Sequence, residues 1–247
     1  MYQVIYDGSF DGFLTLYSHF ENGLEIETII NLNICNSYQP FIFSKEIKTD
    51  LNISNDIIRR VLAAGDKSFL NKLFVAQLCD TDSIELKLLE YVKKFFDNKD
   101  SIHDLSDFIV MDIERIIKKY FNERHKMLGF IRFSEVDDGT MVSFIKPKYN
   151  LIPLLGNHFM KRFPSFKWGI VDRMRNLIGY YDGECYNVSK IEKIDEIVYS
   201  DKEVKIRELW RAFFKSIVID DRISYQRQKG KVPLRVREDM VEFKNDK

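Results

Sequence analysis

The apolar residues of this chain change their spacing near residue 125, and that change constrains the fold more than any other feature of the sequence. Before it, apolar residues recur at intervals of three and four, as on one face of an α-helix. After it, they alternate at intervals of two, as in half-buried strands. The sequence therefore predicts an α+β fold: a helical central block, then a β-hairpin–helix–β-hairpin unit, then a C-terminal helix and a basic arm.

The change of spacing also marks the expected boundary inside the chain. Residues 1–125 are predicted to contain N-terminal strands and the helical block, and residues 126–247 the hairpin unit, the last helix and the arm. We expect the two parts to pack as one compact unit. The apolar stripes of the block, such as Leu88, Val92 and Phe95, are interpreted as core.

Turn residues divide the second part into elements. Asp137-Asp138-Gly139 predicts a hairpin between strands at Leu128–Phe133 and Met141–Ile145. Further along we expect a helix at Leu151–Phe163, strands at Trp168–Asp172 and Leu177–Tyr181, and a helix at Glu203–Val218.

The last predicted helix and the tail after it differ in pattern. The helix carries one apolar face, formed by Ile206, Leu209, Trp210, Phe213 and Ile217. In the tail, Gly230 and Pro233 limit regular structure, so we predict that the tail is irregular.

Charge is segregated along a chain whose formal net charge is zero. Residues 1–44 contain five acids and no Lys or Arg, whereas residues 222–237 contain six Lys and Arg and no acid. Such polarity can steer a polyanion to one surface, although solvated helices also collect charge by chance. Arg222, Gln228 and Arg235 are donor types that contact phosphates and base edges, so we predict that they bind nucleic acid.

The stretch from His158 to Gly183 is dense in aromatic and basic residues. We predict four nucleic-acid contacts in it: Arg162 and Arg175 as phosphate donors, and Trp168 and Tyr181 as stacking surfaces. The alternative is that the arginines are merely solvated and the aromatic residues are half-buried in a sheet.

Three residues of the same stretch could carry chemistry. Asp172 or Asp182 could act as a general base with His158 assisting, while Asp172 beside arginines could equally be an ion-paired structural corner. The sequence has no HExxH pair, no phosphate-binding GxxxxGK[ST] loop and no GxSxG elbow, which disfavours metallohydrolases, P-loop nucleotide hydrolases and serine hydrolases. Whether this chain is an enzyme stays open.

No cofactor or metal is expected in this chain. Cys35, Cys79 and Cys185 are far apart and show no CxxC spacing, so neither an iron–sulfur cluster nor a zinc site is predicted. Asp7 and Asp11 could hold a metal or a sugar hydroxyl, or could serve a turn and a helix start. Without a signal peptide or an apolar span, the sequence predicts a cytoplasmic protein.

Three segments resemble a known family. YDGSFDGFLTLY resembles the start of a family of DNA metabolism and DNA repair proteins. HFMKRFPSFKWGIVDRMRNLIGYYDG and LWRAFFKSIVIDDRISYQRQKGKVPLR look like the core of the domain of unknown function DUF4130. The positions that match the pattern are His158, Arg162, Trp168, Asp172, Asp182, Arg222, Gln228, Pro233 and Arg235. The chain departs from it at Ile223-Ser224-Tyr225, where the family has an Asn–Pro-like segment.

The resemblance implies a role in DNA repair or modification. It further implies a radical-SAM protein as partner, which would hold the iron–sulfur cluster and the S-adenosylmethionine that this chain lacks. Related domains occur fused to uracil-DNA-glycosylase-like domains.

Three functional hypotheses follow. The first is a DNA-binding protein that acts with the radical-SAM partner in repair or modification. The second is a stand-alone glycosylase-like or nuclease-like enzyme using Asp172, Asp182 and His158, with Tyr181 stacking on an extruded base. The third is a protein-interaction scaffold without DNA contact, whose docking face is the acidic N-terminal third.

Overall fold

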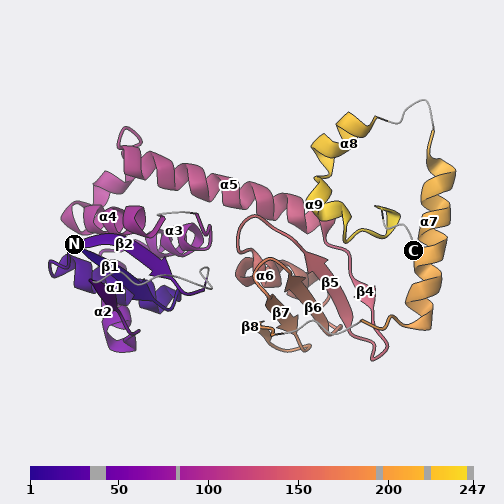
Figure 1. Ribbon diagram of the computed structural model, residues 1–247, viewed down its shortest axis with the longest axis horizontal. Helices are drawn as coiled ribbons and strands as arrows, with labels where there is room; N and C mark the ends of the chain where they lie inside the picture. Colours follow the sequence, from indigo (N-terminus) through magenta and orange to yellow (C-terminus); the bar gives the residue numbers. More distant parts are fainter. Residues whose placement is uncertain (34–42, 82–83, 193–196, 220–223, 244–247) are drawn as a thin grey trace. The chain divides into compact units, whose positions relative to one another are not determined.

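The computed structural model describes residues 1–33, 43–81, 84–192, 197–219 and 224–243 (Figure 1). The chain divides into two compact units, Met1–Asn122 (unit 1) and Glu123–Lys247 (unit 2). Each unit has its own sheet and helices, so the α+β prediction is confirmed. Within the described ranges, no helix is long and apolar enough to span a bilayer.

Unit 1 is built on three parallel strands in the order β2-β1-β3. Ser9 caps the first helix by accepting a hydrogen bond from the backbone N–H of Gly12, at 2.9 Å. The elements are β1 (Tyr2–Tyr6), α1 (Phe10–Glu21), β2 (Ile26–Asn31), β3 (Ser44–Glu46), α2 (Leu51–Ala63), α3 (Lys67–Gln77), α4 (Ile84–Asp97), η1 (Lys99–His103) and α5 (Phe108–Phe130), which continues into unit 2. The predicted stripes are core: Leu88, Val92 and Phe95 are at most 2% exposed.

Unit 2 contains a five-stranded sheet in the order β4-β5-β6-β7-β8. Strands β5 and β6 are parallel, and α6 connects them, whereas the other neighbouring strands are antiparallel. The elements are β4 (Ser134–Glu135), β5 (Met141–Ile145), α6 (Ile152–Arg162), β6 (Trp168–Asp172), β7 (Leu177–Tyr181), β8 (Tyr186–Lys190), α7 (Asp201–Ile217), α8 (Tyr225–Lys231), α9 (Leu234–Arg237) and η3 (Val241–Phe243).

The ring of Tyr186 determines how α6 lies on this sheet. Its hydroxyl donates to the carbonyl of Ile152 at 2.7 Å. A Cβ on Gly156 of α6 would overlap the Tyr186 ring, and a Cβ on Gly179 of β7 would overlap its hydroxyl. Both glycines are therefore required by the close approach of a half-buried tyrosine.

The hairpin around Asp137-Asp138-Gly139 is present, but its predicted first strand, Leu128–Phe133, is wrong. Helix α5 runs on to Phe130, and the strand is only Ser134–Glu135. The reason is visible at Glu123, Met127 and Ile131, which are four apart and all buried. The helical spacing therefore persists past residue 125 and outweighs the local alternation.

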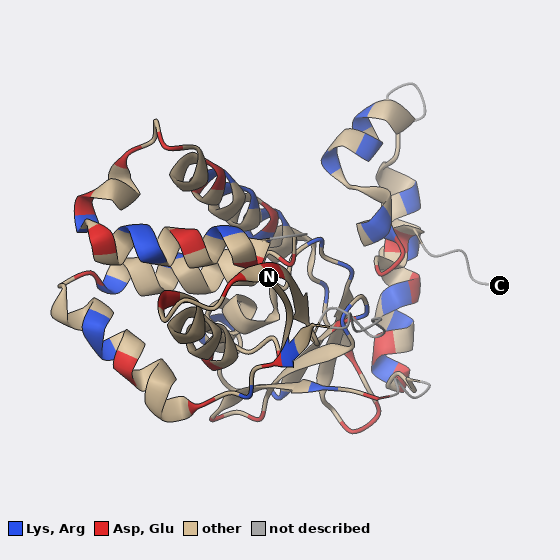
Figure 2. Cartoon of the chain, turned by 60° about the vertical axis from the view of Figure 1, so that its left-hand side comes forward, with Lys and Arg blue, Asp and Glu red and all other residues tan. Residues whose placement is uncertain are grey.

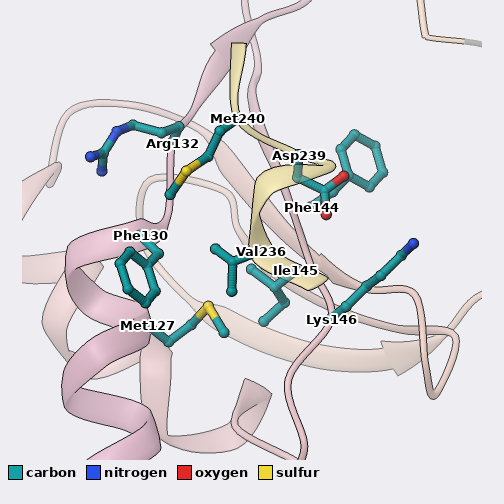
Figure 3. A pocket seen from close by; sticks show the side chains of 9 residues that line it. All are labelled: Met127, Phe130, Arg132, Phe144, Ile145, Lys146, Val236, Asp239 and Met240. Atoms are coloured by element: carbon teal, nitrogen blue, oxygen red, sulfur yellow. The ribbon is translucent and has the colours of Figure 1, made fainter. Parts of the chain in front are cut away.

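The prediction of an irregular tail is also wrong. Ser224 caps α8, accepting from the backbone N–H of Arg227 at 3.4 Å, and Pro233 starts α9. Val236 and Met240 are 7% and 3% exposed. Figure 3 shows Val236 beside Met127 and Ile145, and Met240 lines the same small cavity. Apolar contact, not local propensity, therefore positions this segment.

Helix α7 has its apolar residues on one face as predicted, but that face is not buried. Ile206, Leu209, Trp210, Phe213 and Ile217 are between 43% and 70% exposed. Its first turns are held by Glu203, which is buried and accepts from Arg207 Nε at 2.9 Å and from the Glu135 N–H at 3.3 Å. The helix is thus anchored to β4 at its start, and most of its apolar stripe faces solvent.

Candidate nucleic-acid interface

The two carboxylates that the sequence analysis grouped together lie at opposite ends of the paired strands β6 and β7. Asp172 ends β6, whereas Asp182 follows Tyr181, which pairs with Trp168 at the start of β6. Asp182 lies one residue beyond that pair, so five strand steps of about 3.3 Å put the two acids roughly 16 Å apart along the sheet. Paired catalytic carboxyls of glycosidases are about 5 to 9.5 Å apart. The structure therefore does not bring Asp172 and Asp182 together.

Asp172 forms the ion-paired structural corner that was one of its two alternatives in the sequence analysis. Its side chain is fully buried and accepts from Arg175 Nη1 at 3.0 Å and from the Met174 N–H at 2.8 Å. Burial raises the pKa of the carboxyl, while Arg175 acts in the opposite direction. Arg175 also donates to the carbonyl of Lys148 at 2.7 Å. Both predicted site residues thus hold the turns that follow β5 and β6.

Asp182 and His158 lie apart from this corner. Asp182 is exposed and accepts from the backbone N–H groups of Cys185 and Glu184 at 2.7 and 2.8 Å, which lower its pKa. His158 is half-buried on α6, and burial followed by the charges of Arg162 and Arg124 lowers its pKa. No hydrogen bond or ion pair joins His158 to either carboxylate.

Trp168 and Tyr181 belong to the aromatic core of the sheet. They are 1% and 6% exposed, and their ring centroids are 5.4 Å apart. The Tyr181 hydroxyl donates to the carbonyl of Gly183 at 2.7 Å. A base cannot stack face to face on either ring in this conformation, because both rings are almost fully buried.

Arg235 anchors the C-terminal segment. It forms an ion pair with Glu123, which is 9% exposed and also accepts from the N–H groups of Lys148 and Tyr149 at 2.8 and 3.3 Å. The same edge carries two further ion pairs, Arg173–Asp239 at 3.4 Å and Lys146–Glu238. The cations at this edge are therefore largely neutralised by acids of the same unit.

The small cavity beside α9 is lined by Met127, Phe130, Arg132, Phe144, Ile145, Lys146, Val236, Asp239 and Met240 (Figure 3). Its volume of about 10 Å³ is enough for one water molecule at most. It is a packing gap and offers no room for a substrate.

The cations of α8 are available for a ligand, unlike Arg175 and Arg235. Arg227, Lys229 and Lys231 are exposed and form no ion pair with any acid in the described ranges. Gln228, on the same helix, is half-buried. Arg222 lies outside the described residues.

The charge of the two units differs. Unit 2 has 25 Lys and Arg against 19 Asp and Glu, a net charge of +6, whereas unit 1 has 13 against 19, a net charge of −6. Figure 2 marks the cations along the chain in blue. The basic character seen at residues 222–237 therefore extends to the whole of unit 2.

A pocket that the sequence did not reveal lies at the starts of β5 and β6. Phe133, Met141, Phe163, Phe166 and Trp168 surround a volume of about 80 Å³. Arg162, just before it in the chain, is exposed, and its guanidinium carbon is 5.5 Å from the Phe163 ring centroid. The segment RFPSFKW, which combines cations with aromatic residues, is the sequence signal that could have indicated this pocket.

Asp7 and Asp11 are bound by hydroxyl groups of unit 1. Asp7 accepts from Ser9 Oγ at 2.8 Å and from Thr49 Oγ1 at 2.7 Å, and Ser54 donates to Asp11. Burial raises the pKa of Asp7, but these hydrogen bonds outweigh it and the pKa lies below its ordinary value. Within the described ranges, no three His, Cys, Asp or Glu side chains are grouped closely enough to hold a metal ion.

Comparison with sequence models of protein families matches residues 82–242, which are 161 of the 247 residues, to DUF4130, a domain of unknown function. The chain belongs to the DUF4130 family. The match covers all of the unit 2 sheet and the α8 and α9 helices, together with α4 and α5 of unit 1. Neither the curated proteins nor the solved structures contain a match to this chain.

Proposed function

We propose that this DUF4130 protein binds DNA through unit 2 and acts in DNA repair or modification. The observation that carries the proposal is the set of three cations on α8 that form no ion pair with a described acid, in a unit of net charge +6. Cations already paired with acids gain little from a phosphate, because the existing pair must first be broken. Unpaired cations instead release condensed counterions from DNA on contact, which is the main source of affinity for nucleic acid.

The spacing on α8 suits a backbone contact. Arg227 and Lys231 are four apart and lie on one side of the helix, about 6 Å apart along its axis. Lys229 projects from another side, and Tyr225 at the start of the helix is 72% exposed. Long cationic side chains on such a short helix can reach phosphates of one strand without reading a base sequence.

Direct binding tests this proposal. The full chain is titrated against labelled single- and double-stranded oligonucleotides by fluorescence anisotropy, at salt concentrations from 50 to 200 mM. We expect affinity to fall steeply and linearly on a log–log plot against salt. Absence of binding at 50 mM salt, or an affinity that does not respond to salt, would contradict the proposal.

The radical-SAM partner is part of this proposal and is supported by the resemblance of the three sequence segments. Within unit 2, the exposed apolar stripe of α7 is the surface best suited to such a protein contact, because a large exposed patch is otherwise unfavourable. Affinity purification of the tagged chain after nuclease treatment should recover an iron–sulfur protein that binds S-adenosylmethionine. Leu209→Asp should abolish the recovery. If the unaltered chain recovers the iron–sulfur protein only without nuclease treatment, then DNA, and not α7, joins the two proteins.

A further inference from the structure

The pocket formed by Phe133, Met141, Phe163, Phe166 and Trp168 has an unusual composition for a surface site. Every one of the five side chains is apolar or aromatic, and the volume they enclose is about 80 Å³. Phe166 is 54% exposed, whereas Trp168 is 1% exposed. One aromatic wall is therefore open to solvent and the opposite lining belongs to the core.

We infer that this pocket receives one unpaired base of a single-stranded nucleic acid, with Arg162 contacting the adjoining phosphate. The inference rests on the proposed DNA binding and adds to it a second contact, specific for unpaired nucleotides. Stacking of a base on an aromatic side chain accepts any base, since every base has a π-face. A base inside a duplex is already stacked and paired, so only an unpaired one is available.

The charges around the pocket favour a nucleotide over an apolar peptide side chain. Arg162 and Lys167 flank Phe163 and Phe166 in the chain, and both cations are exposed without an ion pair to a described acid. Lys167 does lie near enough to Asp182 and to Asp138 to lower the pKa of both acids, so these two carboxylates are its opposing charges. Arg162 has no such neighbour among the described acids and is the stronger phosphate contact.

The size of the pocket limits what enters. A dry cavity of about 150 Å³ holds a whole benzene ring, so about 80 Å³ admits only part of one ring. The remainder of the base then lies against the exposed face of Phe166. The Trp168 Nε1–H is buried and has no hydrogen-bond partner among the described residues, and the five lining side chains offer no acceptor and no other N–H group. We therefore expect little discrimination among the four bases.

An abasic oligonucleotide separates stacking from phosphate contact. The full chain is titrated with a labelled dT15 and with a 15-mer of the same charge that carries abasic sugar–phosphate units only. Stacking contributes about 1 to 3 kcal/mol per base, so dT15 should bind about fivefold or more tightly than the abasic strand. Phe166→Ala should remove most of this ratio, and Phe166→Tyr should keep it, because tyrosine retains the stacking face.

Phe213→Ala is the matched control, since Phe213 is 52% exposed on α7 in the same unit. An equal affinity of the unaltered chain for dT15 and the abasic strand would overturn the pocket assignment and leave the proposed DNA binding intact. Loss of the ratio in Phe213→Ala but not in Phe166→Ala would also overturn it. Failure of both strands to bind at low salt would instead refute the proposed function itself.

Discussion

Removal of the three α8 cations should flatten the salt dependence of DNA binding. The variant is Arg227→Gln/Lys229→Gln/Lys231→Gln, which keeps side-chain length and hydrogen-bonding capacity while removing three charges. All three residues are exposed and form no ion pair with a described acid, so their loss should not destabilise unit 2. A change in DNA binding can then be attributed to phosphate contacts.

The magnitude follows from counterion release. Each neutralised phosphate contributes about 0.7 to 0.9 to the slope of log affinity against log salt, so three contacts contribute about 2.1 to 2.7. Between 50 and 200 mM salt the unaltered chain should therefore lose about 20- to 40-fold more affinity than the variant. Fluorescence anisotropy with one labelled duplex, measured at five or six salt concentrations, determines both slopes.

A charge-matched control distinguishes a specific surface from general charge. Lys48→Gln/Lys118→Gln/Lys119→Gln also removes three exposed cations, all from unit 1. The control should keep the slope of the unaltered chain. Equal flattening in both variants, or an unchanged slope in the α8 variant, would refute the assignment of DNA contact to α8.

Three further predictions concern stability, each measured by urea unfolding. Glu123→Ala should lower the free energy of unfolding by about 3 kcal/mol, because it leaves two backbone N–H groups without their acceptor. Arg235→Ala should lower it by about 1 kcal/mol or less, because Arg235 is 44% exposed. Equal losses for the two variants would contradict this prediction. Gly179→Ala should lower the free energy of unfolding by about 1 to 3 kcal/mol, because the new methyl group displaces Tyr186. An unchanged free energy of unfolding would mean that the Tyr186 ring moves aside freely. Burial raises the folded-state pKa of Asp172, so the folded state binds more protons than the unfolded state above about pH 3.9. The stability of the unaltered chain, relative to Asp172→Asn, should therefore fall as pH rises from there to the folded pKa, and a rise would show that Arg175 outweighs burial.

Much of the unit 2 sheet could be predicted because its signals are local. The strands Trp168–Asp172 and Leu177–Tyr181 were predicted with the bounds that the structure gives them. Alternating apolar residues on both sides of a tight turn are sufficient to predict these two strands, since the whole pattern lies within about a dozen residues. The end of α5 was not predictable in the same way, because Met127 is buried beside Val236 and Met240, which lie far along the chain.

The candidate site was less accessible to sequence reasoning. Whether an arginine is available for a phosphate depends on the acid it meets in the fold. Arg235 meets Glu123, 112 residues away, whereas Arg227 meets no described acid. Nothing in the basic run of residues 222–237 distinguishes the two. Likewise, the sequence singled out Trp168 as a stacking surface, but burial leaves Phe166 as the open ring.

We propose that DNA contacts unit 2 through α8 and the segment that precedes β6. Hydrogen exchange of the full chain with and without a single-stranded 15-mer tests it most directly. We predict slower exchange on DNA binding at residues 161–168 and 224–231, and no change within residues 1–107. Protection confined to unit 1, or no protection anywhere at saturating DNA, would contradict the account.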